Sequence, residues 1–296
     1  MDMLRRARRT RRSAHHSASQ QNLSNVANVG GRGTSSGRTG HWEPLSCGPP
    51  IAPPCGANKT VLVGLREAWQ ARADAWIRWS RSPELDDDFW RFHLAQFLDL
   101  LPPPGQLTVD VGCGEGRLGR VLAAAGHRVV GCDAAFAMVK AAVDAPQACA
   151  AVVADAVMLP LRDHAADLVI AFMCLHDFDD MRTAIGEAAR VLAPGGRLAV
   201  ALRHPVVTAK LAGTYAAERR YMADTVKKGG LAMTYEGIHR PLTAYTAALA
   251  ASGLVIEAIR EPAKIEGDNV TMPFLDLLAR RPSDRNRVIS GEGRGG

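Results

Sequence analysis

One short run is the most informative about the fold of this 296-residue chain: Val109-Asp110-Val111-Gly112-Cys113-Gly114-Glu115-Gly116-Arg117. It stands between a β-rich segment, residues 107–111, and an amphipathic segment, residues 117–125, and so predicts a strand, a tight turn and a helix. Its glycines let the chain turn sharply and bring backbone close to a ligand. Asp133 ends the next β-rich segment, 21 residues after Gly112. That spacing matches the ~20 residues expected for an acid that binds ribose hydroxyls.

The alternation of strand and helix patterns continues on both sides of this run. Short apolar segments predict buried strands, and the stretches between them have the three-to-four-residue apolar period of helices. The predicted strands are residues 107–111, 127–132, 150–154, 167–171, 197–202, 254–260 and 273–280, and the predicted helices are 117–125, 135–144, 181–192 and 241–252. This order predicts an α/β fold with a doubly wound, mostly parallel, seven-stranded sheet.

Segments outside this alternation set the predicted domain boundaries. Residues 59–282 are expected to form one domain, with amphipathic cap helices within 61–101 and an irregular insertion at 205–240 that serves as a lid. Residues 1–58 are rich in Arg, Ser, Gly and Pro, residues 283–296 are basic, and both lack an apolar period. We therefore expect two disordered basic tails.

The charge of the chain is divided unevenly. The formal net charge is +6, but residues 1–40 carry eight Arg and one acid, and residues 280–296 carry five Arg and two acids. Residues 41–279 therefore carry a net charge of −4. Because the body has no basic stripe, the sequence argues against a nucleic-acid partner.

Other patterns exclude further classes of protein. No apolar run approaches the ~20 residues of a membrane helix, so no membrane partner is expected. The six cysteines show neither C-x-x-C spacing nor histidines at metal-ligand spacing. We therefore expect reduced cysteines, no metal and a cytoplasmic protein.

A set of short motifs along the chain resembles a known family. The motifs are residues 109–116 (VDVGCGEG), 132–133 (CD), 153–156 (VADA), 167–171 (DLVIA) and 189–198 (ARVLAPGGRL). Their order and gaps resemble those of the class I S-adenosylmethionine (SAM)-dependent methyltransferases, most closely the small-molecule group called methyltransferase type 11. The resemblance covers roughly residues 60–281 and implies a Rossmann-like fold with SAM as the cofactor.

The resemblance also implies ten cofactor-binding residues, grouped by the part of SAM that each would contact. Asp110, Gly112, Cys113 and Gly114 would contact the methionine moiety, and Asp133 would contact the ribose. Ala134, Asp155 and Ala156 would contact the adenine, and Phe172 and Met173 would lie near the sulfonium. A Rossmann dehydrogenase is the competing use of such a loop. Against it, this loop is G-x-G-x-G and not G-x-G-x-x-G, and SAM has no diphosphate to accommodate.

His176 is the predicted catalytic residue. It follows the fourth strand, on the substrate side of such pockets, and a phenol or alcohol acceptor needs a general base. The alternative is a loop histidine that is hydrogen-bonded to Asp177 or Asp179 and has no catalytic task.

Several further side chains are expected around the substrate. The substrate mouth is expected to hold His204, His239, Arg203 and Arg240, and the lid Tyr215, Tyr221 and Tyr235. The helix expected to pack over the cofactor cleft carries Trp69, Trp76 and Trp79. An Arg at the mouth could pair with a substrate carboxylate.

The sequence thus predicts a SAM-dependent methyltransferase that acts on a small molecule at oxygen, nitrogen or carbon by in-line displacement. Two alternatives stay open. One is an RNA methyltransferase whose Arg-rich tail supplies phosphate affinity. The other is a SAM-binding regulatory protein without catalysis. The sequence leaves the acceptor and the oligomeric state undetermined.

Overall fold

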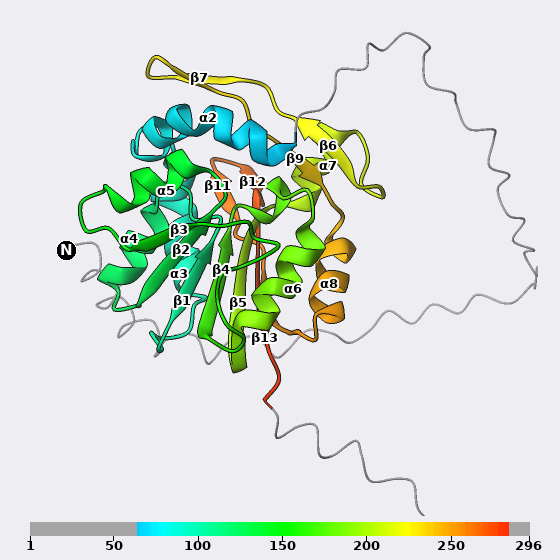
Figure 1. The fold of residues 1–296 in the computed structure, drawn as a ribbon. Helices are drawn as coiled ribbons and strands as arrows, with labels where there is room; N and C mark the ends of the chain where they lie inside the picture. The colour runs from blue at the N-terminus through cyan, green and yellow to red at the C-terminus, as the bar shows by residue number, and fades with distance from the viewer. Residues whose placement is uncertain (1–63, 284–296) are drawn as a thin grey trace, which may run out of the picture. The chain divides into compact units, whose positions relative to one another are not determined.

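The short apolar runs form the strands of one sheet in the computed structural model, which describes residues 64–283. The strands are β1 (Thr108–Val111), β2 (Val129–Asp133), β3 (Ala150–Val153), β4 (Ala166–Phe172), β5 (Leu192–Arg203), β10 (Val255–Arg260) and β13 (Phe274–Arg280). They lie in the order β10-β13-β5-β4-β1-β2-β3, and β13 runs antiparallel to both of its neighbours. The predicted doubly wound, mostly parallel seven-stranded sheet is confirmed (Figure 1).

Helices cover both faces of the sheet, and the two-residue period of the strands explains how. Along β4, Val169 and Ala171 pack with α6 (Met181–Val191) and α8 (Leu242–Ala251) on one face. Leu168, Ile170 and Phe172 alternate with them and pack on the other face with residues of α4 (Arg117–Ala124). A strand that buries both faces is apolar throughout, which is why its sequence reads as a continuous run.

The helical cap differs in one respect from the prediction. The first cap helix is α2 (Leu65–Ser80), and it packs on α5 (Phe136–Val143). The second begins as a π-helix, η2 (Asp88–His93), before α3 (Leu94–Leu98). An apolar period predicts a helix but does not separate an α-turn from a π-turn, because both bury one side of the segment.

The insertion at 205–240 is ordered, and the prediction of an irregular segment is wrong. It holds α7 (Pro205–Ala212), a pair formed by β6 (Arg219–Met222) and β9 (Glu236–His239), and a hairpin of β7 (Val226–Lys228) and β8 (Leu231–Met233). Strands of three or four residues are too short to show a period in the sequence. The hairpin of β11 (Lys264–Glu266) and β12 (Asn269–Thr271) was missed for the same reason.

The cap and the insertion meet over one edge of the sheet. In Figure 1 α2 lies across the end of the sheet and the β7–β8 hairpin lies beyond it, and β8 packs against α2. Within residues 64–283 no helix is both long and apolar enough to cross a membrane. The predicted tails, residues 1–58 and 283–296, lie outside the described residues apart from Ser283.

Candidate active site

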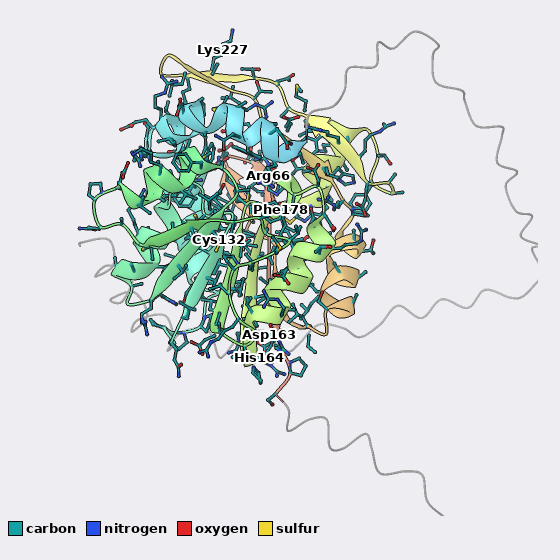
Figure 2. The ribbon with its side chains drawn as sticks, viewed as in Figure 1. Arg66, Cys132, Asp163, His164, Phe178 and Lys227 are labelled. Carbon is teal, nitrogen blue, oxygen red and sulfur yellow. The ribbon has the colours of Figure 1, made fainter. Side chains whose placement is uncertain are left out.

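A pocket of about 840 Å³ opens at the carboxyl ends of the parallel strands. Figure 2 shows Arg66, Cys132 and Phe178 around this edge, with Asp163 and His164 at the opposite end of the sheet. All ten predicted cofactor residues and His176 line the pocket: Asp110, Gly112, Cys113, Gly114, Asp133, Ala134, Asp155, Ala156, Phe172, Met173 and His176. The fold therefore brings the whole predicted set together. The role of each residue stays a prediction.

The glycine-rich loop turns sharply because Gly112, Gly114 and Gly116 adopt positive φ angles of 68°, 56° and 80°. A Cβ on Gly112 would lie 2.7 Å from the Cβ of Cys174, so only glycine fits there. The Gly112 and Cys113 amides donate to the carbonyl oxygen of Cys132 at 2.8 and 3.0 Å. Since these amides are used within the protein, the loop does not offer them to a phosphate, which argues against a dinucleotide.

Asp133, at the end of β2, is tied to the same loop. Its Oδ2 accepts from the Gly114 amide and its Oδ1 from the Ala135 amide, both at 2.9 Å. Burial raises the pKa of this carboxyl. Each carboxylate oxygen has a further lone pair, so the anchored group can still accept from two vicinal hydroxyls.

Asp110, in β1, is a buried acid of the pocket. It is 2% exposed, and its Oδ2 has no hydrogen-bond partner among the described residues. Burial, with a smaller contribution from the charge of Asp133, raises its pKa to about 7. A buried acceptor without a partner calls for an explanation, and a cationic ligand group in the pocket supplies one.

Asp155 follows β3 at the other side of the pocket. Its Oδ1 accepts from the Val157 amide at 3.2 Å, and its Oδ2 forms an ion pair with Arg66 of α2 at 3.0 Å. Both partners are more than a third exposed. A ligand that used Asp155 would therefore meet a cap side chain that sequence reasoning did not connect with this site.

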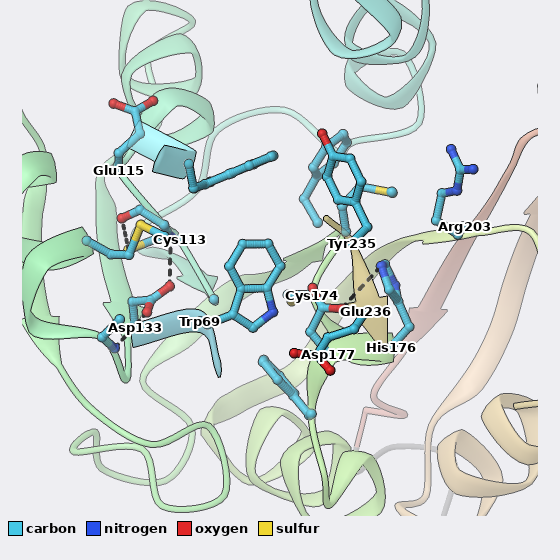
Figure 3. Close-up of a pocket in the computed structure, with 18 of the residues that line it drawn as sticks. Trp69, Cys113, Glu115, Asp133, Cys174, His176, Asp177, Arg203, Tyr235 and Glu236 are labelled. Carbon is cyan, nitrogen blue, oxygen red and sulfur yellow. Dashed lines mark hydrogen bonds and ion pairs between the residues drawn. The ribbon is translucent and has the colours of Figure 1, made fainter. Parts of the chain in front are cut away.

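The cap supplies an aromatic wall, as the tryptophan spacing predicts. Trp69, Trp76 and Trp79 all line the pocket, and the rings of Trp69 and Trp76 meet edge to face at 5.6 Å. Figure 3 shows Trp69 between Asp133 on one side and Asp177 on the other. Trp69 thus lies between the end of the pocket that holds Asp133 and a second end that holds Asp177 (Figure 3).

His176 lies at this second end, buried in the 3₁₀ turn η3 (Leu175–Asp177) (Figure 3). Its Nε2 is 3.7 Å from Asp177 Oδ1, too far for a hydrogen bond, and its Nδ1 has no partner among the described residues. Burial, together with Arg203 and Arg240, lowers its pKa to about 3. The ring is therefore neutral at physiological pH and a weak base.

Carboxyl groups from the insertion and from η3 share this end. Glu236 of β9 forms ion pairs with Arg72 at 2.6 Å and Arg220 at 2.9 Å. Burial and the charge of Glu236 raise the pKa of Asp177 well above its usual range. Sequence reasoning missed Glu236, because its strand pairing with β6 is what brings it to the pocket.

The structure does not bring every expected side chain to the pocket. Arg203, Tyr221 and Tyr235 line it, whereas His204, His239, Arg240 and Tyr215 do not. His204 accepts from the Val206 amide at the start of α7 and contacts Glu261 at 2.8 Å. Arg240 is buried and donates to the carbonyl oxygens of Leu175 and Phe178. The expectation that His204, His239 and Arg240 face the substrate is wrong, because each is engaged in holding a loop or a helix.

His239 of β9 illustrates this structural use. It is fully buried, and its Nδ1 lies 2.8 Å from Thr208 Oγ1 of α7. Its Nε2 lies 3.1 Å from the carbonyl oxygen of Tyr215. Both ring nitrogens thus join segments of the insertion to one another.

Acidic side chains dominate the pocket. Thirteen of the lining residues are Asp or Glu, and five are Arg or Lys. Such a lining attracts cations and repels polyanions. Among the described residues, no group of three or more His, Cys, Asp or Glu is arranged to hold a metal ion.

The strand order, the single antiparallel strand β13 and the glycine-rich loop at the carboxyl edge define the class I methyltransferase fold. Residues 109–200 match the family model described as a methyltransferase domain. Over residues 109–200 the chain thus matches a methyltransferase-domain family, which confirms the resemblance that its motifs indicated.

Curated relatives match over part of the chain. Demethylmenaquinone methyltransferase of Corynebacterium kroppenstedtii is 36% identical over 114 residues, which are 38% of this chain and 48% of that protein. Probable tRNA methyltransferase 9B of Homo sapiens is 38% identical over 100 residues, 33% of this chain and 21% of that protein. The chain therefore spans at most about half the length of these two relatives.

Solved structures share the fold more widely. An S-adenosylmethionine-dependent methyltransferase from Mesorhizobium loti aligns with a TM-score of 0.52 and 23% identity, over 68% of this chain and 99% of that one. At this identity the likeness concerns the fold alone.

Proposed function

We propose that this protein transfers the sulfonium methyl group of SAM to a small-molecule acceptor by in-line displacement. The observation that carries the proposal is the acidic lining of the pocket, with the buried, unpartnered oxygen of Asp110 and the anchored carboxylate of Asp133. These groups match a cation that also presents a pair of ribose hydroxyls.

The residues present fit SAM, part by part. Asp110 would face the methionine ammonium, and Asp133 would accept from the ribose hydroxyls. Asp155 would accept from the adenine amino group once Arg66 moves aside, and Ala134 would pack on the ring. Phe172 and Met173 would border the sulfonium. The bound cofactor supplies a methyl group already activated for displacement.

The protein would then contribute mainly position. Holding the acceptor atom in line with the methyl–sulfur bond can lower the barrier by several kcal/mol without acid or base. The tryptophans of α2 and residues of the β6–β9 pair line the pocket, and they would shield this line from water. His176 would shape the acceptor end, and it is the base that the sequence predicts.

The lining charge favours a small, uncharged or cationic acceptor over a nucleic acid. Thirteen acidic side chains against five basic ones would oppose a phosphate backbone. The similarity to a probable tRNA methyltransferase keeps RNA as a second candidate. The similarity to a demethylmenaquinone methyltransferase supports a small molecule.

One experiment separates these candidates. The protein is incubated with methyl-labelled SAM and a cell extract, which is then fractionated into metabolites, RNA and protein. We expect label in the metabolite fraction. Label in RNA alone would replace our proposal with the RNA candidate, and SAM binding without any transfer would favour a regulatory protein.

The cofactor assignment is tested by titration calorimetry on Asp133→Ala. Loss of its ribose hydrogen bonds should weaken SAM binding by about 1–3 kcal/mol. Asp144→Ala is the matched control, because Asp144 is an exposed acid paired only with Lys140. Equal affinities of Asp133→Ala and the control variant would remove Asp133 from the site.

A further inference from the structure

Two buried side chains from distant parts of the chain, His93 and Asp276, form a pair, and His93 lines the pocket. His93 Nε2 lies 2.8 Å from Asp276 Oδ1, and the two side chains are 1% and 0% exposed. His93 is the last residue of the π-helix η2, and Asp276 lies in the middle of β13. Neither residue belongs to the set assigned to the cofactor.

Packing alone does not account for this pair. A carboxyl group in the centre of an apolar sheet is unfavourable unless it is fully hydrogen-bonded, and Asp276 Oδ2 has no partner among the described residues. The π-helix adds a second unusual feature, since such turns are rare and occur frequently at functional sites. The Asp276 carboxyl group and the π-helix together set the position of the His93 ring.

The register of the sheet places the pair beside the expected site of methyl transfer. Asp276 lies opposite Ala201 of β5, and Ala201 lies opposite Phe172 of β4, one of the residues assigned to the sulfonium region. The His93 ring lies 5.0 Å from the ring of Phe172 and stacks on Phe274 at 4.0 Å, and all three line the pocket. The ring is thus part of an aromatic wall at the acceptor end.

The pairing also defines the chemistry that the ring can perform. With Nε2 donating its N–H to Asp276, the lone pair of the neutral ring lies on Nδ1. Nδ1 makes no hydrogen bond with any described residue. Charged side chains that line the pocket near His93 include Asp88, paired with Lys264 at 3.0 Å, and Arg203, 5.9 Å from the Phe274 ring. His176 is less suited to accept a proton, because two arginines and burial disfavour its charged form.

We propose that His93 is the proton acceptor for methyl transfer to a phenolic hydroxyl, and that Asp276 is the residue that positions it. This inference rests on the proposed function. As the phenol oxygen bonds to the methyl carbon, the carbon–sulfur bond breaks and its electron pair stays on sulfur, which yields S-adenosylhomocysteine. The hydroxyl proton passes to His93 Nδ1. The Asp276 carboxylate stabilises the imidazolium that results. The aromatic wall of Phe89, Phe172 and Phe274 favours a flat ring as the carrier of the hydroxyl.

The first arm of the test needs no acceptor. Long-range ¹H–¹⁵N spectra of the full chain with labelled histidine, in complex with S-adenosylhomocysteine, should show His93 with its proton on Nε2 and a lone pair on Nδ1. His93→Gln identifies the signals, and Asp276→Asn should change the tautomer. A proton on Nδ1 in the wild-type protein would overturn the proposal whatever the activity.

The second arm measures label transfer from SAM to the metabolite fraction. His93→Gln and Asp276→Asn should each lower the rate about 100-fold or more, with SAM affinity within about twofold of wild type. His127→Gln is the matched control, since His127 is also a buried histidine with a hydrogen bond, to Thr108, outside the pocket. Wild-type rates in His93→Gln, or a labelled methyl on nitrogen, would overturn the proposal.

The two arms separate the two proposals. If the wild-type protein transfers no label to any fraction, the proposed function fails, and the tautomer of His93 still decides whether the pair is arranged as a base. Calorimetry with S-adenosylhomocysteine shows which variants remain folded. Asp276→Asn has nearly the same shape as the native side chain, so it is the variant on which a folding failure is least expected.

Discussion

At the scale of single residues, Asp110 gives the pocket a buried carboxyl group that could pair with a cation. Its carboxyl group is almost fully buried and has an oxygen without a partner, and burial raises its pKa to about 7. In the unfolded chain the same group has an ordinary pKa near 3.8. The folded state therefore binds the proton more tightly than the unfolded state.

This difference predicts a specific dependence of stability on pH. The stabilising contribution of protonated Asp110 is complete below about pH 4 and is lost as pH rises to about 7. Asp110→Asn cannot ionise. The free energy of unfolding of wild type, relative to this variant, should therefore fall by about 2–4 kcal/mol over that range, since one pKa unit corresponds to about 1.4 kcal/mol.

Denaturant unfolding at pH 4.5 to 8, without cofactor, measures this difference. Asp144→Asn serves as the control, because that acid is exposed and its difference from wild type should change little over the range. A pH-independent difference for Asp110→Asn would mean that Asp110 is ionised throughout and that its burial is compensated.

At the scale of elements, Arg117 at the end of the glycine-rich run contacts the helical cap and stabilises its position. Arg117 begins α4, and its Nη1 contacts Asp86 Oδ2 at 2.5 Å. Its guanidinium lies 3.6 Å from the ring centroid of Phe89 in η2 and 5.1 Å from that of Trp76 in α2. Three elements thus meet on one cation, which holds the wall of the pocket in place.

Replacing this cation should loosen the cap without unfolding the sheet. Arg117→Met keeps much of the side-chain volume but loses the ion pair and both cation–π contacts, at a cost of about 1–3 kcal/mol. Hydrogen exchange should become faster in α2 and η2 and stay unchanged in β1, β4 and β5. SAM affinity should fall because the cap lines its pocket.

Arg91→Met is the control for this element. Arg91 lies in the same π-helix and forms an exposed ion pair with Asp87, which contributes little. Equal exchange rates of α2 in the two variants would show that contacts other than Arg117 hold the cap.

At the scale of the whole molecule, charge is separated between the ends of the chain and the pocket. The first 40 residues carry a net charge of +7, whereas the pocket is lined mostly by acids. The overall charge of +6 therefore describes the ends of the sequence and not the site. Any affinity for RNA should then reside in residues outside the domain.

Comparison of the full chain with residues 60–296 tests this separation. We expect SAM affinity and label transfer to metabolites to agree within about twofold. Affinity for RNA should be lower in the shorter chain, and in the full chain it should fall steeply with salt, as expected for phosphate contacts. If the shorter chain loses transfer to metabolites while it still binds SAM, the basic end takes part in acceptor binding.

Much of the domain could be predicted from the sequence because its signals are local. The strand around Val109 and the turn at Gly112 depend on neighbouring residues: an apolar run, a glycine with positive φ and an amphipathic helix next to it. The spacing to Asp133 follows from one βαβ unit. For this reason the seven strands, and the gathering of the predicted cofactor residues in one pocket, could be anticipated.

The tertiary structure alone decided what depends on distant pairing. His93 and Asp276 are 183 residues apart, and only the packing of a π-helix against β13 brings them within 2.8 Å. Glu236 reaches the pocket through the pairing of two four-residue strands, and Arg240 is drawn away from it by carbonyl oxygens of η3 and its neighbours. The sequence by itself determined the sheet and the expected cofactor end of the pocket, because local periodicity and motif spacing encode them. The proposed acceptor end is built from contacts between segments far apart in the chain, and no local pattern records those contacts.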